Sequence, residues 1–131
     1  MPISQLEYTD NIIISDSTIQ VFFKKLHIIL KDTIDCNINS CKARAYKLSD
    51  YTIGLDNDDV SFVLLEIKII SGRSSEARLK LKLAANNILK ETIKKENANN
   101  TKTNNIQLRV NITEIDPKYY QMDNIIFANK A

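Results

Sequence analysis

Two stretches of the chain carry apolar side chains at the three- and four-residue spacing that is typical of amphipathic helices. The first runs from about Ser17 to Ile34, and its apolar positions are Ile19, Phe22, Phe23, Leu26, Ile29 and Leu30. The second runs from about Ser75 to Lys95, and its apolar positions include Ala77, Leu81, Ala84, Ala85 and Ile88. Serines stand immediately before both stretches, where a side-chain oxygen can cap a helix N-terminus. We therefore expect two helices.

Four other stretches have the two-residue alternation or the β-branched character of strands. They are Ile3–Tyr8, Cys41–Leu48, Val60–Ile70 and Ile106–Ile115. Val60–Ile70 is almost continuously apolar, which favours a central strand that is covered on at least one face. In Cys41–Leu48 the alternation puts Lys42 and Arg44 on one face of the strand. The order of elements is thus strand, helix, strand, repeated once.

This order predicts an α+β fold made of two tandem β-α-β units, because each unit joins two parallel strands by a crossover helix. We place the units at about residues 1–55 and 56–131, within a single domain of 1–131. Their four strands would form one sheet with both helices on the same face. The other face would be uncovered, and an apolar sheet face would need burial in an oligomer. The tail from Lys118 to Ala131 carries enough apolar side chains to dock somewhere.

Composition narrows the choice of function. The 131 residues include 18 Lys and Arg against 16 Asp and Glu, and this net charge of +2 does not favour a nucleic-acid or charged-membrane partner. No apolar run approaches the roughly 20 residues that span a bilayer. The start of the chain lacks the pattern of a signal peptide, so we expect a cytoplasmic protein with reduced cysteines. Cys36 and Cys41 have no second cysteine pair or histidine cluster nearby, so no metal site is expected.

Pro2 is the first candidate for chemistry. Cellular processing usually removes an initiator methionine that precedes a small residue such as proline, and this would leave a rigid secondary amine at the start of a strand. A free α-amino group has a pKa of about 7.7–8.0, and burial or cationic neighbours lower it further. Such a neutral amine can act as a general base or a nucleophile. The plainer reading is that many chains begin Met-Pro with no catalytic role.

Arg73 is the second candidate, in the segment Ser71-Gly72-Arg73-Ser74 between the predicted central strand and the second helix. Backbone N–H groups at a helix N-terminus favour an anion, and a guanidinium matches the geometry of a carboxylate. The alternative is a well-capped turn with an exposed arginine. Lys42 and Arg44 are the third candidate. They face either a pocket or the solvent, where they would protect an edge strand against aggregation.

Taken in order, these features make the chain resemble the tautomerase superfamily, and more closely the 5-carboxymethyl-2-hydroxymuconate isomerase family. The resemblance rests on Pro2 through Glu7, Asp10-Asn11, Lys42-Ala43-Arg44, Ile70 through Arg78, and Glu114-Ile115-Asp116-Pro117 with Asn124 further on. Pro2 and the Gly72-Arg73-Ser74 segment are its specific parts.

The resemblance implies a homotrimer that converts a dienol polycarboxylate, from the breakdown of aromatic compounds, to its keto isomer without any cofactor or metal. It implies that Pro2 is the catalytic base and that Arg73 holds a substrate carboxylate. The family's second arginine position falls on Lys42, with Arg44 two residues on. This departure leaves two alternatives open, a tautomerase with a different keto-enol acid substrate and a non-catalytic trimeric ligand-binding or structural protein of the same fold.

Overall fold

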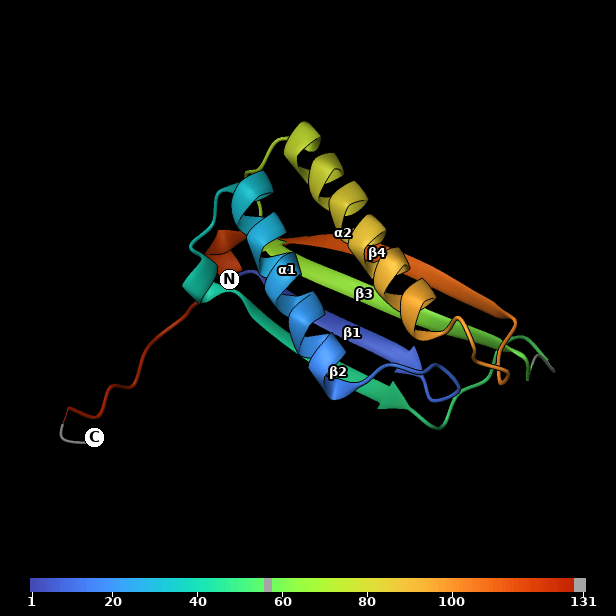
Figure 1. Ribbon diagram of the computed structural model, residues 1–131. Coiled ribbons are helices and arrows are strands. Elements are labelled where there is room, and N and C mark those ends of the chain that lie inside the picture. The colour runs from blue at the N-terminus through green and yellow to red at the C-terminus, as the bar shows by residue number, and fades with distance from the viewer. Residues whose placement is uncertain (56–57, 129–131) are drawn as a thin grey trace.

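The computed structural model describes residues 1–55 and 58–128. It contains four strands, two long helices and two short 3-10 turns (Figure 1). The strands are β1 (Ile3–Thr9), β2 (Lys42–Leu48), β3 (Val60–Ile70) and β4 (Asn105–Ile115). The helices are α1 (Asp16–Ile34) and α2 (Ser75–Glu96), and the 3-10 turns are η1 (Ile38–Ser40) and η2 (Pro117–Tyr119). Each expected helix and strand is present within a residue or two of its predicted ends.

The strands form one sheet in the order β2-β1-β3-β4. β1 and β2 are parallel, β3 and β4 are parallel, and the central pair β1 and β3 is antiparallel. The helices α1 and α2 lie side by side on one face of the sheet (Figure 1). The predicted α+β fold of two tandem β-α-β units is therefore confirmed. The first residue of the proposed second unit, residue 56, and the last three residues of the chain lie outside the described residues.

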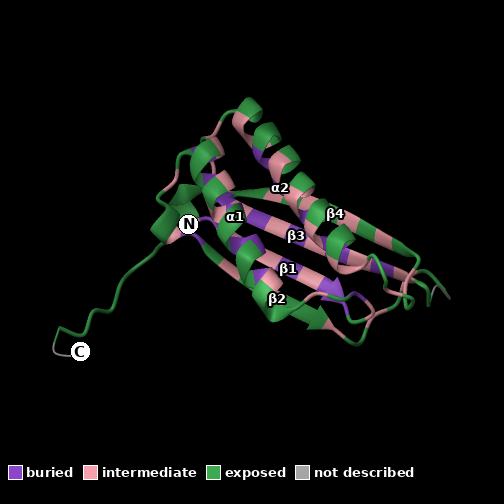
Figure 2. Cartoon of the chain, in the orientation of Figure 1, coloured by how far each residue is buried: buried purple, intermediate pink, exposed green. Residues whose placement is uncertain are grey.

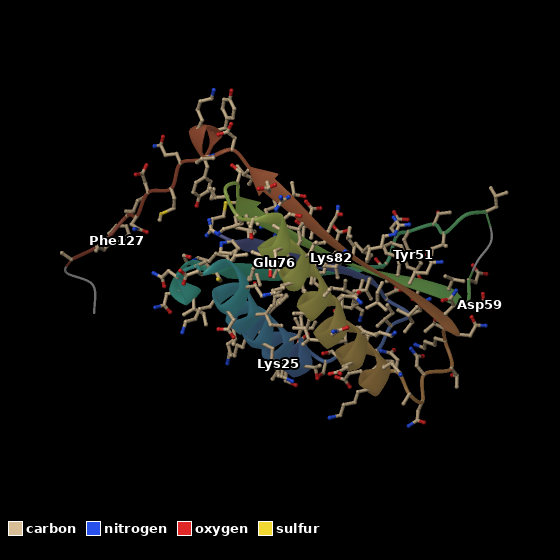
Figure 3. All side chains as sticks on the ribbon, turned by 90° about the horizontal axis from the view of Figure 1, so that it is seen from above. Lys25, Tyr51, Asp59, Glu76, Lys82 and Phe127 are labelled. Atoms are coloured by element: carbon tan, nitrogen blue, oxygen red, sulfur yellow. The ribbon has the colours of Figure 1, made fainter. Side chains whose placement is uncertain are left out.

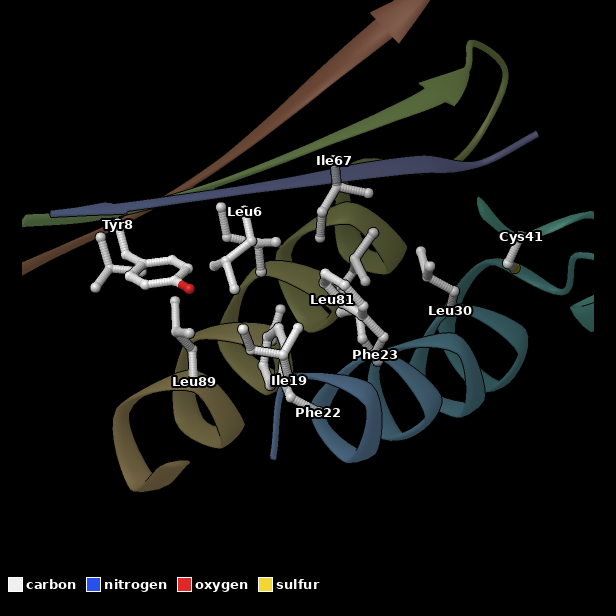
Figure 4. Close-up of a cluster of buried hydrophobic side chains, with 14 of the residues drawn as sticks. Leu6, Tyr8, Ile19, Phe22, Phe23, Leu30, Cys41, Ile67, Leu81 and Leu89 are labelled. Atoms are coloured by element: carbon white, nitrogen blue, oxygen red, sulfur yellow. The ribbon is translucent and has the colours of Figure 1, made fainter. Parts of the chain in front are cut away.

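The core lies between the sheet and the helices (Figure 2). Alternate side chains of β1 and β3 point toward the helices and are buried, as Leu6, Leu65 and Ile67 show. The apolar faces of the two helices pack against these strand side chains (Figure 4). The fully buried helix positions, each with at most 1% of the side chain exposed, are Phe22, Leu26, Leu30, Leu81, Ala85 and Leu89. This burial supplies the main driving force for folding.

The open face of the sheet differs from the expectation of an apolar surface. The outward positions of β3 include Glu66 and Lys68, and β1 contributes Glu7 to the same face. None of these three side chains is fully buried. The nearly continuous apolar appearance of β3 hid the fact that two of its outward positions are charged. The other outward positions of β3 are apolar, as Phe62 and Leu64 show, so the open face is mixed and its expected burial in an oligomer stays a prediction.

The C-terminal tail also differs from the expectation that it docks. After η2 it runs away from the sheet and the helices (Figures 1 and 3). Ile125 and Ile126 are each 83% exposed and Met122 is 59% exposed. Ile125 and Ile126 are thus accessible to another molecule, whereas the first part of the tail stays near the sheet.

Candidate functional site

The chain segments that carry Pro2, Lys42 and Arg73 lie at the same end of the sheet. Ile3 at the start of β1 is aligned with Lys42 at the start of β2 and with Lys68 near the end of β3. At the same end, Ile70 of β3 is aligned with Ile115 of β4. The N-terminus, the start of β2, the turn into α2 and the start of the tail therefore emerge together. This convergence follows from the topology, because parallel pairs start and end together and the antiparallel pair reverses between them.

Pro2 is buried at this end and is held by its backbone. Its carbonyl oxygen accepts a hydrogen bond from the backbone N–H of Lys42 at 3.0 Å, which continues the β1–β2 ladder by one residue. Pro2 has no N–H to donate, so the start of an inner strand is a position that tolerates it. The structure contains Met1, so the nitrogen of Pro2 is in a peptide bond here, and a free secondary amine appears once Met1 is removed.

A cavity of about 490 Å³ opens beside Pro2. Its wall is formed by both residues flanking Pro2, by the η1 loop, by Lys42 and by the tail, namely Met1, Ile3, Asn37, Asn39, Ser40, Lys42, Tyr120, Met122, Asp123 and Asn124. Lys42 is the cation in this wall, and Asp123 is the acidic residue. A smaller hollow of about 300 Å³ lies between the helices near Ser17 and Glu96 and contains none of the predicted site residues.

The ammonium group of Lys42 folds back onto the η1 loop. Its Nζ donates hydrogen bonds to the carbonyl oxygens of Asn39 at 3.3 Å and Ser40 at 3.2 Å. These contacts hold a strongly hydrated point charge at the cavity wall without neutralising it. The charge of Lys42 also reaches α1, where burial first and Lys42 second lower the pKa of His27. Lys42 therefore gives the cavity wall a cation that can bind a carboxylate, and Asp123 adds an acidic side chain to the same wall.

Arg73 lies at the same end of the molecule but not in the cavity wall of this chain. Gly72, with a φ of 117°, makes the turn from β3, and Ser74 then caps α2 by accepting a hydrogen bond from the N–H of Ala77. The Nε of Arg73 donates to the carbonyl oxygen of Ile34 at 2.8 Å, which neutralises part of the negative C-terminus of α1. Within the described residues, the Nη atoms of Arg73 make no hydrogen bond or ion pair, so they can still meet an anion.

Arg44 is not brought to the cavity. It lies further along β2, where its Nη2 donates to Oε1 of Gln5 at 3.0 Å and its guanidinium is 6.0 Å from the centre of the Tyr46 ring. Because β2 is an edge strand, Arg44 matches the alternative interpretation of a charge that discourages edge-to-edge pairing. Lys42 shares that strand face but lies at its cavity end.

Sequence reasoning did not identify several cavity residues. The tail side chains Tyr120, Met122 and Asp123 line the cavity, although the sequence indicated only an apolar segment that docks somewhere. Asn37 and Asn39 came from a polar connection with no recognisable motif. Asn124, which belonged to the resemblance, was the one available signal that the tail approaches the site.

The described residues contain no group of three or more His, Cys, Asp or Glu side chains arranged to hold a metal ion. No helix among residues 1–55 and 58–128 is long and apolar enough to cross a membrane. What the arrangement offers chemically is a buried proline directly after Met1, a cavity beside it, one lysine in the cavity wall and one arginine nearby.

Comparison with solved structures places this arrangement among known folds. A 5-carboxymethyl-2-hydroxymuconate isomerase from Deinococcus radiodurans R1 is 28% identical, with 95% of this chain and 90% of that chain covered and a TM-score of 0.79. A macrophage migration inhibitory factor-like protein from Entamoeba histolytica is 18% identical, with 96% and 98% covered and a TM-score of 0.65. A fused 4-OT protein, solved as a symmetric trimer, is 16% identical, with 98% and 94% covered and a TM-score of 0.68.

The last two similarities concern the fold, since their identities are low. No sequence among the curated proteins matches this chain. The family comparison does find a match, and it covers residues 2–128 with the 5-carboxymethyl-2-hydroxymuconate isomerase family. The match begins at Pro2 and includes Lys42, Arg73 and the cavity-lining part of the tail. This chain therefore belongs to the 5-carboxymethyl-2-hydroxymuconate isomerase family, and it is an isomerase of the tautomerase fold.

Proposed function

We propose that this isomerase converts a dienol polycarboxylate, of the 5-carboxymethyl-2-hydroxymuconate class, to its keto isomer by proton transfer through Pro2. The observation that carries the proposal is the convergence of Pro2, Lys42 and Arg73 at the end of the sheet that holds a 490 Å³ cavity. Family membership supports the reaction type, and the similar Deinococcus protein bears that isomerase name. The substrate class and the role of Pro2 are our inference for this chain.

The proposed proton transfer begins with removal of Met1. The ring nitrogen of Pro2 would then be a neutral secondary amine, since an α-amino group has a pKa of about 7.7–8.0 that burial and a nearby cation lower. In the reaction, this nitrogen takes the proton from the enol hydroxyl of the substrate. The electrons of the broken O–H bond form the C=O bond, the diene shifts, and the nitrogen returns the same proton to carbon. The substrate is isomerised and Pro2 ends neutral, as it began.

The two cations would bind and polarise the substrate. Lys42 reaches a carboxylate by leaving the carbonyl oxygens of Asn39 and Ser40. Arg73 would pair through its Nη atoms, while its Nε stays on Ile34. Lysine makes a point contact where arginine makes a two-point fork, so Lys42 is expected to orient the carboxylate less strictly. This difference bears on which polycarboxylate is preferred rather than on the proton transfer.

We also propose that the functional unit is a homotrimer. The exposed apolar tail, with Ile125 and Ile126 each 83% exposed, supports an assembly. The position of Arg73 also supports an assembly. Arg73 lies outside the cavity wall of its own chain, so in a trimer it could complete the cavity of a neighbouring subunit. Light scattering at micromolar concentration should give about three times the chain mass, and a monomer would contradict the assembly.

The decisive test is an ultraviolet assay of 2-hydroxymuconate-type dienols with the wild type, Pro2→Ala and Arg73→Ala. Intact mass must first show that Met1 is absent. We expect Pro2→Ala to lose most of the activity and Arg73→Ala to lose about 2–4 kcal/mol of transition-state stabilisation in kcat/KM. Equal rates for the wild type and Pro2→Ala would contradict the proton-transfer role.

The same assay separates the alternatives. Turnover of a different keto-enol acid, with none of the dienol, would keep Pro2 as the base and change the substrate. Absence of turnover for every keto-enol acid, in a protein that lacks Met1, would instead favour a non-catalytic trimer. The non-catalytic alternative is worth testing because Lys42 stands where the family has an arginine.

A further inference from the structure

The two cysteines, for which the sequence indicated no role, are in contact. The Sγ atoms of Cys36 and Cys41 lie 3.6 Å apart. A disulfide bond is about 2.05 Å long, so modest rotations of the two side chains would bring the sulfurs within bonding distance. The ring that such a bond closes contains the four residues 37–40, and three of these line the cavity.

The two sulfurs differ in access. Cys41 is 7% exposed and lies beside Leu30 at the end of the core (Figure 4). Cys36 follows the left-handed Asp35, with a φ of 51°, that ends α1, and it is partly exposed. A reagent from solvent therefore meets Cys36 first, and Cys41 is placed to react second, from the inside.

The environment of Cys41 also favours a reaction in which Cys36 reacts first and Cys41 second. Burial, a hydrogen bond to Cys36 and negative charge on Cys36 raise the pKa of Cys41 to about 12, so Cys41 keeps its proton while Cys36 reacts. Once Cys36 is part of a mixed disulfide it carries no charge, and two of these three causes disappear. Cys41 then loses its proton more easily and becomes a better nucleophile.

We propose that Cys36 and Cys41 form a redox-active dithiol that reacts with a low-molecular-weight disulfide and closes reversibly into an intramolecular disulfide. The Cys36 thiolate attacks one sulfur of oxidised glutathione, which forms a mixed disulfide and releases one glutathione. The Cys41 thiolate then attacks the Cys36 sulfur, which forms the internal disulfide and releases the second glutathione. Two protein thiols are oxidised, one disulfide is reduced to two thiols, and the two protons pass to the released glutathiones.

Closure would act on the wall of the cavity. The η1 loop is at present held by local hydrogen bonds, such as that from the Ser40 Oγ to the carbonyl oxygen of Asn37 at 2.6 Å, and by the weaker contact from the Cys41 Sγ to the same oxygen at 3.8 Å. Lys42 directly follows Cys41, and its ammonium lies on the carbonyls of Asn39 and Ser40. The disulfide would therefore restrict the motion of the loop that the cavity lysine contacts. This inference does not depend on which substrate the cavity binds.

The test uses the folded, reduced protein and oxidised glutathione, followed by intact mass. We expect the wild type to lose two hydrogen atoms with no glutathione attached, and dithiothreitol to reverse the change. Cys41→Ser should trap one glutathione on Cys36, because the second step has no nucleophile. Cys36→Ser should react at least about tenfold more slowly, because its remaining thiol is buried. In urea both single variants should react alike, which controls for intrinsic reactivity.

Other outcomes would overturn the proposal. A stable glutathione adduct on the wild type would show that Cys41 does not resolve it, and a cross-linked dimer would show that the sulfurs pair between chains. No reaction of the folded wild type would exclude the site. Hydrogen exchange gives the second measurement, in which the amides of residues 38–41 should exchange more slowly in the oxidised form. Unchanged exchange would show that the bond does not tie the loop.

Discussion

The contacts of Lys42 indicate how strongly the candidate site can bind a carboxylate. Its ammonium has two carbonyl partners on the η1 loop, and a substrate carboxylate would have to compete with both. Since a hydrogen bond to a charged group contributes about 1.5–3 kcal/mol, losing this cation should lower kcat/KM by roughly ten- to a hundredfold in Lys42→Ala. Steady-state kinetics on the dienol substrate measures this.

Lys47 provides the matched control for that change, because it lies on the same strand and is also exposed, but away from the cavity. Lys47→Ala should leave kcat/KM close to that of the wild type. A similar loss in both variants would mean that the general positive charge of β2 matters, and not the position of Lys42.

His27 connects the site to stability. Its pKa is lowered from 6.5 by burial and then by Lys42, and its buried Nε2 has no hydrogen-bond partner among the described residues. Between the lowered pKa and 6.5 the unfolded chain binds more protons than the folded chain, so stability is lost as pH falls through this range. Urea unfolding at about pH 7.5 and about pH 5 should show a larger loss for the wild type than for His27→Gln. Equal losses would mean that the acid sensitivity lies in other groups.

At the scale of elements, α2 offers a direct comparison between its two faces. Leu81 is fully buried against the sheet, whereas Leu83 is 58% exposed on the same helix. Leu81→Ala should cost about 2–5 kcal/mol of unfolding free energy through lost burial and the cavity left behind. Leu83→Ala should change it by no more than about 0.5 kcal/mol in the monomer. Denaturant titration of both variants tests whether the helix is anchored as described.

The turn between β3 and α2 depends on Gly72. Its φ of 117° is a conformation that side chains disfavour, although an added Cβ would meet no atom within 4 Å. Gly72→Ala should therefore cost roughly 1–3 kcal/mol through backbone strain and should also displace Arg73. Ser71→Ala, one residue earlier, is the control and should be nearly neutral. If Gly72→Ala keeps both stability and kcat/KM, the turn does not position Arg73.

The elements were predictable because each has a local period or, in β3, an almost continuous apolar and β-branched run. The stripe through Phe22, Leu26 and Leu30 has the repeat of a helix and no competing pattern. The parallel pairing within each unit followed from the β-α-β connection, whereas the antiparallel pairing of β1 with β3 was not predicted. The placing of Asp123 in the cavity with Lys42 could not be predicted, because it depends on contacts between distant segments. The contact of Cys36 with Cys41 is local, but it depends on the fold of the η1 loop, for which the sequence has no recognisable motif. The outward charges of β3 were visible in the sequence, but its apolar average concealed them.

At the scale of the whole molecule, the two β-α-β units contribute different residues to the candidate site. The first β-α-β unit contributes Pro2, Lys42 and the cysteine pair, and the second contributes Arg73 and the tail. The candidate site needs both units, because the antiparallel contact of β1 with β3 is what aligns them. Asn97 strengthens this union at the other end of the helices, where its side chain bonds both the N–H and the carbonyl of Ile13.

The N-terminus and the start of the C-terminal tail lie at the same end of the sheet as the candidate site (Figure 1), and this bears on where a purification tag or a fluorophore can be attached. A fusion before Met1 would keep the Pro2 nitrogen in an amide bond. The loop after β2 leaves from the opposite end of the sheet, and Gly54 and Leu55 are exposed there. A short peptide tag inserted between them should leave isomerase activity within about twofold of the untagged protein. An N-terminal fusion should be inactive until a protease releases Pro2.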